Sequence, residues 1–245
     1  MFTPVSVHRR TRREQPPAPR DELVILRITI PSRRLRLGLV LTAVALLLAS
    51  SIVVALDTAT RTSGGSVREA FDFVSFWLNV NYERNLPAWY SSILLVVVAL
   101  VAWDLARVER VLHRSPWWAW ACVAVTFACL SMDELLQMHE QSSTLAVLLL
   151  PLIVLFALAT LPLLRALPRR IAFQLIGAGA VFVGGSLGME LIGNLLAETS
   201  QLLIHLEEAA ELIGTALVLA AIAEYREALD HERVDGVAAR HVATA

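Results

Sequence analysis

The residues best suited to chemistry are carboxylates and histidines that lie within or at the ends of apolar segments. Imidazole and carboxylate together suit Zn, Mn or Fe better than Ca. We therefore predict a divalent metal site whose ligands come from three stretches of the chain: Glu134, His139, Glu190, His205, Glu208 and Glu211. We expect the neighbouring acids Asp133 and Glu140 to act on this site, one of them by supporting the ligands or as a catalytic base.

The composition indicates a membrane protein. Of the 245 residues, 56% are hydrophobic, and the mean hydropathy is +0.61. A soluble domain of this length is usually more polar. The net charge of −1 argues against a nucleic-acid partner. Membrane lipids are the expected partners, and homo-oligomerisation is left open.

The apolar runs predict an all-α fold, a six-helix transmembrane bundle. Each run has about the twenty residues that a helix needs to cross a bilayer core. A basic tail, residues 1–36, precedes the bundle, and a second tail, residues 226–245, follows it. The predicted spans lie at about 37–57, 88–106, 117–138, 144–164, 171–196 and 202–224.

Arginine predicts the topology of these spans. The N-terminal tail, the two loops after the second and fourth spans, and the C-terminal tail are rich in arginine. A six-span arrangement puts these four segments on one side and leaves only Arg61, Arg68 and Arg84 on the other. By the positive-inside rule both termini are cytoplasmic, and the expected location is a bacterial plasma membrane.

The first outer loop predicts a short interfacial helix. Ser66 and Glu69 have the spacing of a capping box, so a helix can begin there. Apolar residues then recur at helical spacing, which favours a helix lying on the outer leaflet. Trp89 and Tyr90 follow as anchors at the membrane interface.

Position along the helices brings the three chemical stretches to a similar depth. At about 1.5 Å per residue, Asp133 lies about 25 Å from the inner end of its span and Glu190 about 28 Å from the inner end of its own. In the last span, Glu211 and His205 lie about 20 and 28 Å from the inner end. Three spans thus carry acids or histidine in the outer third of the membrane, which favours one shared site.

Other residues bear on packing. Gly184 and Gly188 form a small-xxx-small face that lets another helix approach closely. Asp104 lies near the inner end of the second span, beside Arg107, and is expected as a solvated or paired helix-end residue. Trp120 is expected as an anchor at the inner membrane boundary.

Each chemical stretch also has an ordinary structural explanation. The segment DELLQMHE fits a helix leaving the bilayer, and HLEEAAELIG fits a solvated turn at the end of a span. Glu190 fits a buried, protonated acid bonded to Asn194. Because an acid in a helix centre costs about 2.5–3.5 kcal/mol to insert, three such stretches at one depth favour a functional site.

Three strings, NYERNLPAWYSS, LSMDELLQMHE and HLEEAAELIG, resemble an uncharacterised group of bacterial multi-pass membrane proteins. The shared features are a Glu-x-Asn-Leu-Pro-x-aromatic turn, an Asp-Glu-x4-His-Glu helix end and a Glu-rich last span. The resemblance covers most of residues 70 to 225. It implies a multi-pass fold and no particular activity.

Three interpretations of function remain open. The leading one is metal-assisted hydrolysis or oxidation of a lipid-like substrate. The second is a proton- or cation-coupled transporter, which would use intramembrane acids. The third is a non-catalytic membrane scaffold whose acids bind a structural cation. The sequence contains no phosphate loop and no dinucleotide-binding fingerprint.

Overall fold

The computed structural model describes residues 32–60, 65–82, 84–112, 116–136, 143–196 and 201–243. Within these ranges the chain forms seven helices and no strand, so the all-α prediction is confirmed for the described residues. The helices are α1 (Ser32–Thr60), α2 (Ser66–Leu78), α3 (Leu86–Val111), α4 (Trp117–Leu136), α5 (Ser143–Ala166), α6 (Arg169–Leu196) and α7 (Gln201–Ala243).

Four of the described helices contain a segment that is long and apolar enough to cross a membrane. α7 is not among them, because acids and an arginine interrupt its apolar part on both sides. In α5, only the shorter segment Phe156–Ala166 was identified as apolar among its described residues. The four segments are Arg33–Asp57 in α1, Leu86–Val111 in α3, Trp117–Leu136 in α4 and Arg169–Gly193 in α6.

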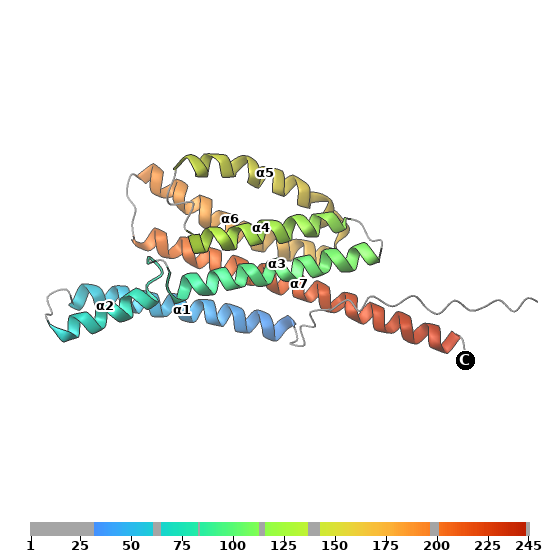
Figure 1. Ribbon diagram of the computed structural model, residues 1–245, viewed down its shortest axis with the longest axis horizontal. Coiled ribbons are helices and arrows are strands. Elements are labelled where there is room, and N and C mark those ends of the chain that lie inside the picture. Colours follow the sequence, from blue (N-terminus) through green and yellow to red (C-terminus); the bar gives the residue numbers. More distant parts are fainter. Residues whose placement is uncertain are drawn as a thin grey trace, which may run out of the picture.

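The helices form an elongated bundle (Figure 1). α7 packs against α6, α1 and α3, while α4 packs against α3, and α5 contacts α4. The core lies where α3, α4 and α7 meet, with Leu105, Trp120 and Ile222 almost completely buried. One end of the bundle, which we call the His205 end, holds the start of α7; the opposite end, the Arg226 end, holds the start of α1.

α7 is much longer than the predicted last span. The helix continues past Glu224 to Ala243 and projects beyond the other helices (Figure 1). The residues after Glu224 are mostly Ala, Arg, Glu and Leu, which favour helix. Segment 226–245 was predicted as a tail; through Ala243 it is helical.

α2 begins where the sequence predicts, but without the predicted capping box. The N-cap residue is Gly65, with φ of 72°, and no side chain caps the helix. Ser66 is therefore the first helical residue, one position too late for its hydroxyl to serve as the cap. The positive φ explains why glycine occupies the preceding position.

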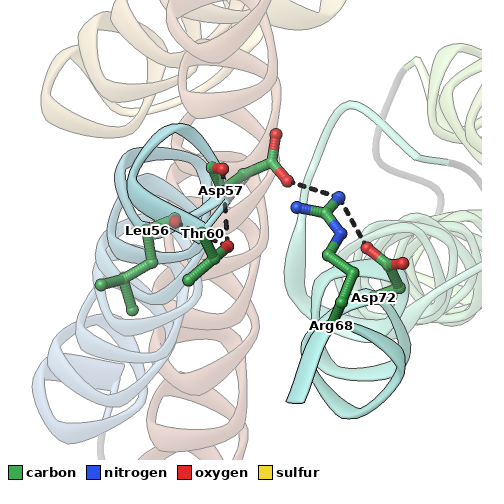
Figure 2. Close-up of polar contacts among 5 residues, drawn as sticks. All are labelled: Leu56, Asp57, Thr60, Arg68 and Asp72. Carbon is green, nitrogen blue, oxygen red and sulfur yellow. Dashed lines mark hydrogen bonds and ion pairs between the residues drawn. The ribbon is translucent and has the colours of Figure 1, made fainter. Parts of the chain in front are cut away.

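α2 runs back alongside the last turns of α1 (Figure 1). Arg68 of α2 donates to Asp57 of α1 at 2.9 Å and pairs with Asp72 in its own helix at 2.7 Å (Figure 2). Burial acts to lower the pKa of Arg68, but the hydrogen bonds to Asp72 and Asp57 outweigh it, so the pKa lies above its ordinary value. The guanidinium is thus a permanently charged link between the two helices.

α6 and α7 approach each other at glycines, but not at the glycines predicted. A methyl group on Gly185 would overlap the Cβ of Ala210, and one on Gly214 would lie 2.8 Å from the Cβ of Phe182. No described atom lies within 4 Å of a Cβ at Gly184 or Gly188. The prediction for that pair was wrong, because α7 contacts the face one residue further round α6.

Candidate functional site

His205 lies in the first turns of α7, and two hydrogen bonds orient its ring. Nδ1 is 2.8 Å from the carbonyl oxygen of Gln201. A carbonyl can only accept, so Nδ1 carries the proton and donates it. Nε2 lies 3.2 Å from the hydroxyl of Ser50 on α1 and, in the neutral ring, accepts from it. A histidine fixed this way by a backbone carbonyl is oriented as metal-binding histidines commonly are.

Ser50 links this histidine to the loop between α2 and α3. Its side chain is fully buried, and its oxygen accepts a hydrogen bond from the Val80 N–H at 3.0 Å. Asn81 in the same loop donates to the side chain of Gln201. Three segments that are distant in the sequence therefore meet around the first turn of α7.

Asparagines organise the loop itself. Asn85 caps α3 by accepting from the Ala88 N–H at 3.2 Å, and its amide donates to the carbonyl of Asn79. Asn79 in turn accepts from the Asn81 N–H at 3.0 Å. Asn85 is fully buried. The buried side chains of Asn79 and Asn85 thus satisfy backbone groups before and after this turn, as cap and turn chemistry favours.

The predicted acids lie on the expected helices. Asp133 and Glu134 follow Ser131, which exchanges hydrogen bonds with Ser92 of α3, and both acids are half-buried. Glu208 and Glu211 are also half-buried. Glu208 follows His205 by three residues and Glu211 follows Glu208 by three, so each is a neighbour of the one before it on the helix surface.

Glu190 comes level with His205 in the backbone of the adjacent helix. The contact between Gly185 and Ala210 sets the register of antiparallel α6 and α7. Five residues further toward the His205 end, forward in α6 and backward in α7, Glu190 lies opposite His205. The side chain of Glu190 is not among the described ones.

The metal site itself is not assembled from the described side chains. Among them, no group of three or more His, Cys, Asp or Glu residues could hold a metal ion. His139 and Glu140 lie outside the described residues. The ligand set therefore stays a prediction.

A second polar cluster lies at the Arg226 end. Arg226 of α7 donates to Asp104 of α3 at 2.8 Å, and the two side chains are only 6% and 9% exposed. Arg226 also pairs with Asp230 at 2.5 Å. The expected proximity to Arg107 was misleading, because the partner of Asp104 comes from another helix.

The neighbours of Arg226 extend this cluster. Tyr225 donates to the buried carboxylate of Glu109 and stacks on Trp120, with 5.9 Å between ring centroids. Trp120 is 1% exposed, so its prediction as an interface anchor was wrong. Glu224 accepts from Arg36 of α1 at 2.9 Å and pairs with Arg170 of α6 at 3.1 Å. One turn of α7 thereby contacts α1, α3, α4 and α6.

Sequence reasoning did not pair these residues. The predicted sixth span ends at Glu224, just before Tyr225 and Arg226, and charged residues are common at the end of a span. The available signal was the burial implied for Asp104 and Glu109, since two acids one and a half turns apart on an apolar helix require partners.

Together, the apolar helices and the polar groups between them are those of a helical membrane protein. Its family is of unknown function. The chain belongs to the family described as "Domain of unknown function (DUF8692)", whose model matches residues 34–224. The match includes α1, which the resemblance noted above did not cover. Comparisons with curated proteins and with solved structures gave no match.

Proposed function

We propose that this protein is a multi-pass integral membrane protein that binds a divalent metal ion at its His205 end, and that the metal serves chemistry on a lipid-like substrate. The observation that carries the proposal is the orientation of His205. Its Nδ1–H is committed to the Gln201 carbonyl, which directs the basic Nε2 away from its own helix. Only the hydrogen bond from Ser50 must be exchanged for a metal to bind there.

The proposed ligands are His205 and Glu208 on α7, Glu190 on α6, and Glu134, His139 and Glu211. His205 and Glu208 stand three residues apart, a spacing that puts both side chains on one helix face. Asp133 and Glu140 are the proposed bases. Zn, Mn or Fe bound to such a set would act as a Lewis acid and lower the pKa of a bound water.

The proposed topology has six spans, α1 and α3 to α7, with both termini in the cytoplasm. The Arg226 end carries Arg36, Arg107, Arg165 and Arg170, which supports its assignment to the cytoplasmic side. The metal site would then lie at the outer boundary, open to lipid from the outer leaflet.

The alternative of a proton- or cation-coupled transporter has less support. Between the acids of α7 and Glu224, the helix presents an apolar segment, residues 216–223, seven of whose eight side chains are buried. A conducting path would need polar groups or water at this level. The other alternative, a non-catalytic scaffold with a structural cation, would have the same metal site but would not convert a lipid substrate.

Metal titration tests the proposal. Full-length protein in detergent is stripped with chelator and titrated with Zn²⁺ or Mn²⁺, beside Glu208→Gln and the control Glu69→Gln, an exposed acid on α2. We expect about one equivalent bound by the native protein and the control, and affinity reduced about tenfold or more in Glu208→Gln.

Equal affinity in Glu208→Gln and native protein would overturn the ligand assignment. Proton-coupled flux in proteoliposomes that is lost in Glu208→Gln, with metal content unchanged, would establish the transporter instead. If bound metal raises the thermal stability of the protein but no tested lipid is converted, the scaffold interpretation is supported instead.

A further inference from the structure

Arg84 has an unusual backbone conformation. Its φ of 60° makes it the one non-glycine residue with positive φ in the described part of the chain. L-residues with a Cβ adopt this left-handed region at a cost, and glycine or asparagine normally occupy it. An arginine held there calls for a functional explanation.

The turn around Arg84 enforces this conformation. On its C-terminal side, Asn85 is buried completely and is committed both to the cap of α3 and to the carbonyl of Asn79. Pro87 follows in the first turn of α3. The residues that follow Arg84 are thus fixed by the cap of α3, and Arg84 enters this cap with a left-handed backbone and an exposed side chain.

Aromatic residues precede and follow Arg84 in the sequence, in α2, in the turn and in the first turn of α3. Tyr82 stacks on Phe76 of α2, with 6.4 Å between ring centroids, and Trp89 meets Trp77 edge to face at 5.6 Å. Phe76, Tyr82 and Trp89 are each more than two-fifths exposed. No ion pair joins Arg84 to another residue in the described ranges, whereas Arg68 nearby is held by two aspartates.

We propose that Arg84 binds the phosphate of a phospholipid headgroup at the His205 end of the bundle, with the exposed aromatic rings against the lipid's glycerol and upper acyl region. A guanidinium matches phosphate oxygens with paired hydrogen bonds. Aromatic rings favour the interfacial depth at which headgroups lie. An exposed cation in the turn that joins the helices carrying these rings complements a lipid with an anionic headgroup and apolar chains.

This lipid site adjoins the proposed metal site. The same loop contacts α1 through the Val80 N–H, which donates to Ser50, the partner of His205. It contacts α7 through Asn81, which donates to Gln201. A phospholipid held by Arg84 is therefore the substrate class we infer for the metal. That second step rests on the proposed function, whereas the binding of the lipid does not.

Native mass spectrometry of the full-length protein in detergent tests the lipid site. Four delipidated proteins are titrated with dihexanoyl phosphatidylglycerol: the native protein, Arg84→Gly, Arg84→Lys and the control Arg107→Gln. Arg107 is an exposed arginine at the opposite end of α3. Arg84→Gly tolerates the backbone conformation, so it should fold. We expect its affinity to fall at least about tenfold, that of Arg84→Lys to fall less, and that of the control to match the native protein.

Affinity in Arg84→Gly equal to the native value would overturn the inference, as would an equal loss in Arg107→Gln. Displacement of the lipid by equimolar inorganic phosphate would also overturn it, because the site would then recognise a free anion. If the native protein binds no metal but shows the Arg84-dependent lipid binding, the proposed function fails and the lipid site stands. If it binds metal and Arg84→Gly binds lipid normally, the lipid inference alone fails.

Discussion

Arg226 and Asp104 form a buried ion pair that joins α7 to α3, with 2.8 Å between Nε and Oδ2. They are separated by 122 positions in the chain. Two adjacent residues of α7 make further contacts. Glu224 contacts α1 and α6, and Tyr225 contacts α3 and α4. This turn of α7 therefore holds the Arg226 end together.

Breaking the ion pair should destabilise the protein strongly. Arg226→Met leaves the Asp104 carboxylate buried without its partner, and we expect a loss of about 3–5 kcal/mol in the free energy of unfolding. The double variant Asp104→Leu with Arg226→Met should lose much less than the sum of the single changes. Denaturant unfolding in detergent measures both. Single variants within about 0.5 kcal/mol of the native protein would contradict a buried pair.

Tyr225→Phe removes a single oxygen. It leaves the buried Glu109 carboxylate without the tyrosine hydroxyl but preserves the stacking on Trp120. The expected cost is about 1–3 kcal/mol, the range for stranding a buried acceptor. Tryptophan fluorescence should stay close to native, because the ring contact is kept. A large spectral shift with unchanged stability would point to a different arrangement.

The glycines of α6 provide a matched pair. Gly185→Ala places a methyl group against Ala210 of α7 and should cost about 1–3 kcal/mol through overpacking. Gly184→Ala, one residue away, meets no described atom and should be neutral or slightly stabilising, since alanine favours helix. Thermal unfolding of the two variants compares them directly. The reverse order would mean that α7 packs on the face first predicted from the sequence.

Ser50→Ala tests whether the hydrogen bonds of Ser50 to Val80 and His205 stabilise the fold without being needed for metal binding. The change strands the Val80 N–H, so stability should fall by about 1–3 kcal/mol. It also removes the donor that occupies Nε2 of His205, so the affinity for metal should be maintained or rise. Metal titration measured beside the unfolding transition checks both effects. Loss of metal binding in this variant would show that Ser50 supports the site in another way.

The helices could be predicted from the sequence because apolar runs of bilayer length are a local signal. Each of the six predicted spans falls on a described helix, and four of these helices contain a segment apolar enough to cross a membrane. The six-span count itself stays a prediction. The start of α2 was also predicted at the correct residue, although Gly65 rather than Ser66 is its cap. Local composition carries this information.

Contacts between helices could not be predicted in the same way. The pairing of Asp104 with Arg226 depends on the rotation of α3 and α7 about their axes, which no nearby residue reveals. Which of Gly184 and Gly185 faces α7 depends on a rotation of about 100° per residue. His205 was predicted as a site residue from its depth, but its bond to Ser50 required the fold.

Metal content of the purified full-length protein, measured by mass spectrometry beside His205→Ala, tests the central proposal most directly. We expect about one equivalent of Zn, Mn or Fe in the native protein and its loss in His205→Ala, with the helical content unchanged. Absence of metal from the native protein after purification and reloading would contradict the metal site. So would the same metal content in His205→Ala.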